Sequence, residues 1–206
     1  MNLNDFYQKL YDTGCVKFGE FTLKSGIKSP VYVDFRVTVS NPELLKEIGK
    51  VLAEKAKEIG CDRLCAIPYA GLPLGVAASI EGGIPLVYSR KEAKTYGTGK
   101  LIEGKFETSD RVLVVDDIVT DGASKVEAVK PLKEQGLNVT DILVIIDREQ
   151  GGAKLLGEAG YKLHSVGTLS QILEYLKSQN KIEDDLYIRV KEFIAENQFK
   201  EIKLNK

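Results

Sequence analysis

The chain has 206 residues, of which 43% are hydrophobic and 29% are charged, a balance typical of a globular protein and not of a disordered one. With 29 basic and 30 acidic residues, the formal charge of −1 argues against a general nucleic-acid or membrane-surface binder. A single histidine excludes a metal site built from several histidines, and no uninterrupted apolar stretch approaches the ~18 residues of a membrane span.

The first forty residues fit no regular alternation, and we expect a helix and a small flanking hood there. The clearest helix covers residues 42–59. Asn41 can cap it, Pro42 suits its first position, and Gly60 supplies a stop. Beyond it, short apolar runs alternate with amphipathic stretches. Strands are predicted at Arg63–Ile67, Pro85–Ser89, Arg111–Val115, Asp141–Ile146 and Lys162–Val166, and helices at Leu72–Ile80, Ala123–Gln135 and Gly151–Ala159.

Near-continuous apolar strands are covered on both faces, and their alternation with helices predicts an α/β fold with a parallel sheet. Helices at Ser170–Ser178 and Asp184–Asn197 should end the chain. We expect a single domain, with the hood in residues 1–40, the core in 41–180, and a C-terminal helix and tail in 181–206. Pro131 should kink or end its helix at a cost of ~3 kcal/mol.

The run from Arg111 to Ser124 is the most informative for function. Its strand leads into two acids, Asp116 and Asp117, and then into a polar turn that opens a helix. A helix start offers N–H groups and a positive dipole end, so this turn suits a phosphate, while the acids suit ribose hydroxyls or positive charge on the ring. The alternative is a strand that ends in acids and a polar turn without a ligand.

The segment Val114–Ser124 resembles the phosphoribosyl diphosphate (PRPP) signature of type I phosphoribosyltransferases. The resemblance implies that family's α/β fold, a mainly parallel five-stranded sheet flanked by helices with a small N-terminal hood. It also implies that PRPP is bound, with Mg²⁺ carried mainly by PRPP itself and not by a protein metal site. The implied PRPP contacts here are Asp116, Asp117, Ile118, Val119, Thr120, Asp121, Gly122, Ala123 and Ser124, with Asp116 and Asp117 as catalytic acids.

The basic, glycine-containing loop Arg90–Lys100 resembles that of orotate phosphoribosyltransferases, where it reaches across a homodimer into the partner's site. The resemblance assigns Arg90, Lys91 and Lys94 to the diphosphate, with Lys94 catalytic. Tyr96, also assigned to PRPP, stands where many bacterial members have histidine, and here the loop is similar to the transferase half of bifunctional UMP synthases. A solvated charged loop is the alternative.

Further matches cover most of the chain. They imply PRPP contacts by Lys24 and Tyr69, and an orotate pocket formed by Tyr32, Val33, Thr120 and Arg148. A guanidinium is always charged and binds carboxylates in bidentate fashion, which suits orotate. His164 lies in a predicted strand, where a structural role is expected.

The expected activity is therefore orotate phosphoribosyltransferase, which forms orotidine 5′-monophosphate and diphosphate from orotate and PRPP in de novo pyrimidine biosynthesis. Transfer to a purine base or uracil, or PRPP sensing without transfer, remain the alternatives. No nucleic acid or membrane partner is expected. Three cysteines without a CxxC motif and a start without a signal-peptide pattern predict a cytoplasmic protein.

Overall fold

The computed structural model describes residues 2–23, 26–90 and 101–198. In this part of the chain, the central sheet has six strands in the order β5-β4-β3-β6-β7-β8. The five predicted strands are parallel to one another, which confirms the predicted fold class, and the unpredicted β5 pairs antiparallel with β4 at the edge. Their bounds are β3 (Arg63–Ala66), β4 (Leu86–Ser89), β5 (Ile102–Glu103), β6 (Arg111–Val119), β7 (Asn138–Asp147) and β8 (Lys162–Thr168).

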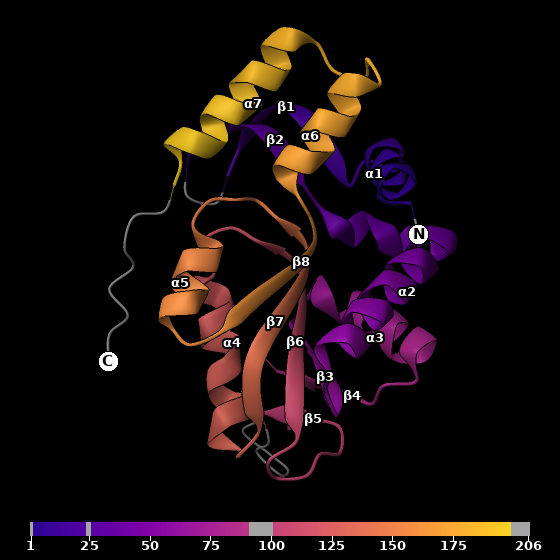
Figure 1. The fold of residues 1–206 in the computed structure, drawn as a ribbon, viewed down its shortest axis with the longest axis vertical. Helices are drawn as coiled ribbons and strands as arrows, with labels where there is room; N and C mark the ends of the chain where they lie inside the picture. Colours follow the sequence, from indigo (N-terminus) through magenta and orange to yellow (C-terminus); the bar gives the residue numbers. More distant parts are fainter. Residues whose placement is uncertain (1, 24–25, 91–100, 199–206) are drawn as a thin grey trace.

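Helices cover both faces of the sheet (Figure 1). Successive residues of a strand point to opposite faces, so Leu113 and Val115 of β6 pack in one core cluster while Val112 and Val114 pack in the other. The first cluster includes α2 (Pro42–Ile59) and α3 (Gly71–Gly82), and the second includes α4 (Ala123–Glu134) and α5 (Gly152–Glu158). This two-sided burial explains why the strands are apolar throughout. No helix in the described part of the chain is both long enough and apolar enough to cross a bilayer.

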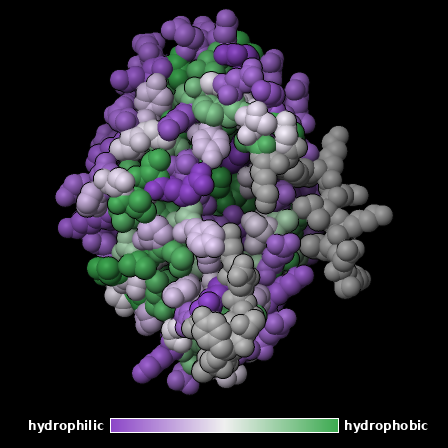
Figure 2. Space-filling model, turned by 180° about the vertical axis from the view of Figure 1, so that it is seen from behind, coloured by the Kyte–Doolittle hydropathy of each residue, from purple (hydrophilic) through white to green (hydrophobic). Residues whose placement is uncertain are grey.

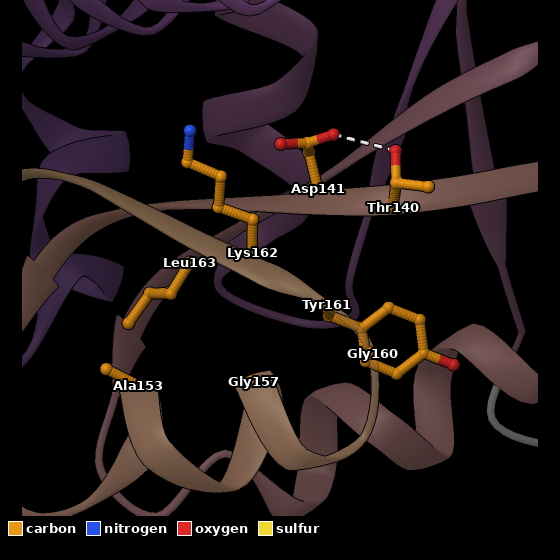
Figure 3. Close-up of a pocket in the computed structure, with 8 residues that line it drawn as sticks. All are labelled: Thr140, Asp141, Ala153, Gly157, Gly160, Tyr161, Lys162 and Leu163. Carbon is orange, nitrogen blue, oxygen red and sulfur yellow. Dashed lines mark hydrogen bonds between the residues drawn. The ribbon is translucent and has the colours of Figure 1, made fainter.

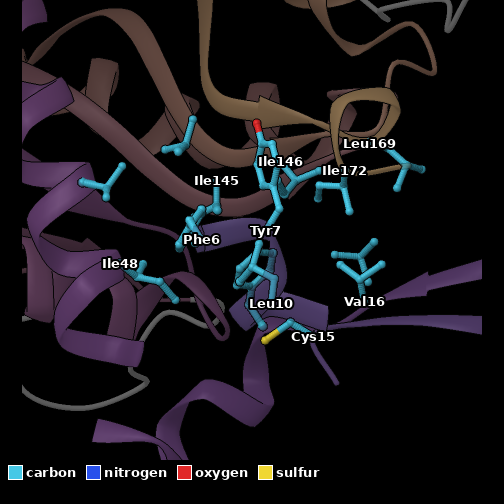
Figure 4. Packing of buried hydrophobic residues seen from close by; sticks show 14 of the residues in the cluster. Phe6, Tyr7, Leu10, Cys15, Val16, Ile48, Ile145, Ile146, Leu169 and Ile172 are labelled. Carbon is cyan, nitrogen blue, oxygen red and sulfur yellow. The ribbon is translucent and has the colours of Figure 1, made fainter. Parts of the chain in front are cut away.

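The larger cluster lies between β7 and three helices, α1 (Leu3–Asp12), α2 and α6 (Leu169–Ser178) (Figure 4). Phe6, Leu10 and Ile48 are fully enclosed there, and each such side chain contributes about 1.5–3 kcal/mol by its burial. The ring of Tyr7 is buried, and its hydroxyl donates a hydrogen bond to Gln171 Oε1 at 3.1 Å, which links α1 to α6.

The predicted hood is a two-stranded antiparallel sheet of β1 (Val16–Thr22) and β2 (Lys28–Val33), followed by the 3₁₀ helix η1 (Phe35–Ser40). Helix α7 (Asp184–Glu196) packs on β2. Figure 1 shows β1, β2, α6 and α7 beyond the carboxyl ends of β6, β7 and β8. The hood therefore stands over the edge of the sheet where ligands bind in parallel α/β folds.

Helix α4 continues past Pro131 to Glu134, so the proline, which stands in the last turn, does not end the helix. The predicted end of one strand is wrong. Strand β6 continues past Val115 to Val119, so Asp116 and Asp117 lie within the strand and not beyond it. Parallel pairing with β7, including Asp116 with Val144 and Val119 with Asp147, holds these residues in the sheet despite their polarity.

Candidate active site

The site lies where the strand order of the sheet reverses. From β3 the chain crosses to β4 on one side, whereas from β6 it crosses to β7 on the other. In open α/β sheets the loops that follow two such strands diverge, and ligands bind between them at the carboxyl edge. The loop after β3 carries Tyr69, and the turn after β6 carries Thr120–Ser124, so the topology brings together two segments predicted to bind PRPP.

Gly122 forms the turn into α4. Its φ is 86°, and a Cβ at this position would lie 3.0 Å from Leu156 Cγ and 3.3 Å from Gly152 O, so the position requires glycine. Asp121 Oδ1 accepts a hydrogen bond from Ala123 N at 3.0 Å, which shapes the chain just before the helix. The turn therefore has no side chain at Gly122, which would let a phosphate approach the backbone at the start of α4 closely.

Asp116 and Asp117 differ in their surroundings. Asp116 is buried, and its Oδ2 lies 2.7 Å from Lys125 Nζ while its Oδ1 accepts a hydrogen bond from Asp117 N at 2.9 Å. Asp117 is half-buried and accepts a hydrogen bond from Ile118 N. Burial, reinforced by the negative charge of Asp116, raises the pKa of Asp117 to about 7. One acid is thus a paired carboxylate, and the other changes charge near neutral pH.

Arg148 lies directly after β7, beside the same turn, because its N–H donates to Val119 O at 3.0 Å. Its side chain is only 6% exposed, and Nε and Nη2 have no hydrogen-bond partner among the described residues. Burial lowers the pKa of Arg148 from its ordinary value. A buried guanidinium with two unpaired donors is costly unless a ligand completes it, and a carboxylate matches both donors at once.

The other predicted contacts come from the loop before α3, from the hood and from the end of β4. Tyr69 precedes α3 and is 70% exposed. In the hood, Tyr32 stacks on Phe21 with ring centroids 5.4 Å apart, while the Val33 side chain is buried in the core and leaves only its backbone for a ligand. Arg90 follows β4 and forms an ion pair with Glu103 of β5 at 3.1 Å. The predicted contacts Lys24, Lys91, Lys94 and Tyr96 lie outside the described residues.

No family model matches the chain. It is 45% identical over 92% of its length to the uridine 5′-monophosphate synthase of Bos taurus, of which it spans 40%. It is 40% identical over 80% of its length to the orotate phosphoribosyltransferase of Pyrococcus abyssi, and it covers 92% of that protein. The chain belongs to the orotate phosphoribosyltransferase family. The predicted family is thereby confirmed.

The fold of this chain is also found in a solved structure. The UMP synthase of Leishmania donovani superposes with a TM-score of 0.88 at 36% identity, over 95% of this chain and 43% of that one. The chain thus spans about two fifths of the length of the two UMP synthases that it matches. The sequence similarity of its basic loop to such enzymes agrees with this relationship.

Two further residues pack on Asp116, and no motif of the sequence marks them. Lys125 lies one residue beyond the segment Val114–Ser124, and the one signal that could identify it is a lysine in the first turn of a helix. Gly71 is the first residue of α3. A Cβ at Gly71 would lie 2.9 Å from Asp116 Oδ1 and 3.0 Å from Val115 O, so the start of α3 packs directly on the acid.

A hollow of about 660 Å³ lies near the amino ends of β7 and β8, away from the candidate site at the carboxyl edge (Figure 3). His164 lies in β8 as predicted, with Nε2 2.6 Å from Asp141 Oδ1. Although burial favours the neutral acid, hydrogen bonds with His164 and Thr140 keep the pKa of Asp141 below its usual range. These polar contacts are satisfied within the chain, which favours a structural role for His164.

Proposed function

We propose that this chain transfers the 5-phosphoribosyl group of PRPP to N1 of orotate, forming orotidine 5′-monophosphate and diphosphate in pyrimidine biosynthesis. The observation that carries the choice of orotate is Arg148, whose buried Nε and Nη2 have no partner among the described residues. Orotate carries a carboxylate that would complete them, whereas uracil and the purine bases carry none. The hydrogen bond from Arg148 N to Val119 O, which holds the backbone of Arg148 next to the residue before the turn at Thr120–Ser124, supports this assignment.

In this proposal PRPP lies along the carboxyl edge of the sheet. Its 5-phosphate is held by the turn at Thr120–Ser124 and the start of α4, and its ribose hydroxyls meet Asp116 and Asp117. The bond between C1 and the diphosphate oxygen breaks as the bond from C1 to N1 forms. The electrons of the broken bond leave with the diphosphate, so positive charge develops on the ribose, where the acids stabilise it.

Cations of the loop Arg90–Lys100 stabilise the leaving diphosphate, with Lys94 in the catalytic role. Arg90 already pairs with Glu103, which fixes the first residue of this loop at the end of β4. Lys24 and Tyr69 complete the contacts to PRPP, and the backbone at Tyr32 and Val33 lines the orotate pocket with Thr120.

Magnesium would enter with the substrate. The described residues contain no group of three or more side chains that could hold a metal ion, and Asp116 is already paired with Lys125. We therefore propose that the ion is held mainly by the diphosphate and hydroxyls of PRPP together with water, and not by a set of protein ligands. When bound, Mg²⁺ neutralises part of the diphosphate charge.

We further propose that the protein is a homodimer, with the loop Arg90–Lys100 shared between subunits. An apolar surface that suits such an interface lies along α2 and α3, where Ile80 is 75% exposed and Val76 is 46% exposed. Figure 2 shows hydrophobic side chains on this side of the molecule. The three free cysteines suit a reducing compartment, so we place the protein in the cytoplasm.

The activity is tested by supplying PRPP and Mg²⁺ with orotate, uracil or hypoxanthine and measuring diphosphate release. Only orotate should support turnover. Transfer to hypoxanthine or uracil would assign the chain to another branch of phosphoribosyltransferases. Absence of diphosphate release with every base, together with salt-dependent binding of RNA or DNA, would favour a PRPP-sensing regulator.

The role of Arg148 is tested with Arg148→Lys, which keeps the charge but loses the planar pair of donors. The KM for orotate should rise about 10- to 100-fold, the cost of one strong charge-assisted contact, while the KM for PRPP stays within twofold. Arg111→Lys is the matched control, because Arg111 is exposed at the opposite end of the neighbouring strand. An unchanged KM for orotate in Arg148→Lys would overturn the assignment.

A further inference from the structure

Lys125 is buried at the base of the candidate site. It stands in the first turn of α4, and its side chain is 8% exposed, as is that of Asp116. Its Nζ lies 2.7 Å from Asp116 Oδ2 and 3.4 Å from Ser124 Oγ. One ammonium group therefore contacts an acid of the ribose site and a hydroxyl of the phosphate turn.

This position is unfavourable for a lysine on two grounds. The first turn of a helix is the positive end of its dipole, which repels a cation, and burial removes the water that would stabilise the charge. A buried ion pair offers little net stability over an apolar pair of similar size. Stability alone therefore does not account for a lysine here.

The pair does fix the geometry of the site. Asp116 is held at both oxygens, by Lys125 at Oδ2 and by Asp117 N at Oδ1, and Gly71 leaves space for Oδ1 that a side chain at that position would occupy. The ammonium also balances one of two adjacent negative charges in a confined space. Besides the larger effect of burial, the charge of Asp116 already raises the pKa of Asp117, and Lys125 opposes that effect, so the repulsion between the two carboxyl groups would be stronger without the ammonium.

We propose that Lys125 is a positioning residue of the transfer reaction, which orients Asp116 toward the ribose, compensates its charge, and couples it to Ser124 in the phosphate turn. The inference rests on the proposed function, because it concerns PRPP at the same site. Lys125 acts through its two neighbours and need not touch the substrate.

The first test compares Lys125→Met, which keeps the apolar stem, with Lys130→Met, which removes an exposed ammonium from the same helix. In Lys125→Met, kcat/KM for PRPP should fall about 100-fold, the loss expected when a reacting group is misplaced by ~1 Å. The KM for orotate should stay within twofold, and Lys130→Met should match the wild type. Wild-type kcat/KM for PRPP in Lys125→Met would overturn the proposal.

Amine rescue separates charge from packing. Propylammonium should restore turnover of Lys125→Ala in a saturable manner, whereas propanol, of similar size but uncharged, should not. Equal rescue by both molecules would show that Lys125 only fills space and would overturn the proposal.

A third variant tests the proposal even if the single variants fail to fold. If the single variants lose their cooperative thermal transition, the double variant Asp116→Asn/Lys125→Met removes both charges and should regain it. Its kcat/KM for PRPP should remain low, because the oriented carboxylate is gone. Recovery of wild-type kcat/KM together with the thermal transition would show that the pair is only structural.

Calorimetric binding of PRPP separates this proposal from the proposed function. If the wild type binds PRPP without turning over any base, the transferase assignment fails, and weaker binding by Lys125→Met still supports the positioning role. If the wild type is active and Lys125→Met binds and turns over PRPP normally, the positioning role fails alone.

Discussion

Asp117 is the residue of the site whose charge should respond most directly to pH. Its raised pKa of about 7 means that in the free enzyme it is protonated below that pH and ionised above it. If the ionised form meets the ribose hydroxyls, kcat/KM for PRPP should fall about tenfold per pH unit on the acid side. A pH–rate profile of the wild type measures this acid-side fall in kcat/KM, the acid limb of the profile. Asp117→Asn should have low activity without the limb, and a limb that persists in the variant belongs to another group.

Gly71 and Gly157 offer a matched pair of glycine substitutions within helices. In Gly71→Ala the new methyl group would press on Asp116 Oδ1 and Val115 O, so we expect a loss of about 1–3 kcal/mol in the free energy of unfolding. We also expect a fall in kcat/KM for PRPP. Gly157 in α5 has open space around it, so Gly157→Ala should gain about 0.5–1 kcal/mol and leave activity unchanged. Denaturant titrations measure both free energies of unfolding, and equal changes in the two variants would contradict the prediction.

At the scale of elements, the loop after β7 joins the site to the last two helices. Glu149 Oε2 accepts a hydrogen bond from Ser170 N at 2.8 Å, and Glu149 O accepts one from Gln198 Nε2 at 2.7 Å. Gln150 is 1% exposed and donates from Nε2 to Asn197 O at 3.1 Å. The residues that follow Arg148 thus link the loop to α6 and to the end of α7, and these contacts hold the backbone of the loop.

We therefore expect Gln150→Met, which keeps the volume of the side chain but removes its amide, to loosen this loop. The KM for orotate should rise several-fold, whereas the KM for PRPP should not change, since within the described part of the chain Gln150 makes no hydrogen bond to the turn and Asp121 holds the turn's own bond to Ala123 N. Gln179→Met, at an exposed position after α6, is the control. A parallel rise of both KM values would show that the loop supports the whole site.

The core elements could be predicted because each follows from a local signal. Strands β3, β4 and β6–β8 are marked by apolar runs. Helix α2 is marked by its end signals, Asn41, Pro42 and Gly60. Both kinds of signal lie within a few neighbouring residues of the sequence. The hairpin β1–β2 and the two-residue β5 depend on pairing with distant segments, so no periodicity marked them. The candidate site divides in the same way. The local motif Val114–Ser124 predicts the turn before α4, whereas the Asp116–Lys125 pair forms only when α4 packs against β6, which no local pattern predicts.

At the scale of the whole molecule, the reversal of strand order decides where the chemistry can occur. It opens the carboxyl edge between β3 and β6, and the hood with α7 stands beyond that edge (Figure 1). The turn, the acids and Arg148 are all supplied by one chain. The loop Arg90–Lys100, in contrast, is proposed to act on the site of the other subunit, which makes the dimer and not the single chain the unit of catalysis.

Sharing of the loop can be tested by mixing two inactive variants. Lys94→Ala should disable the loop, and Asp117→Asn should disable the ribose site. If each loop serves the neighbouring subunit, a mixed dimer has one site with both defects and one with neither, so an equal mixture that exchanges subunits freely should regain about a quarter of wild-type activity. If each loop serves its own subunit, every mixed site retains one defect and activity should not return. Mixing two preparations of the same variant is the control, and it should restore nothing in either case.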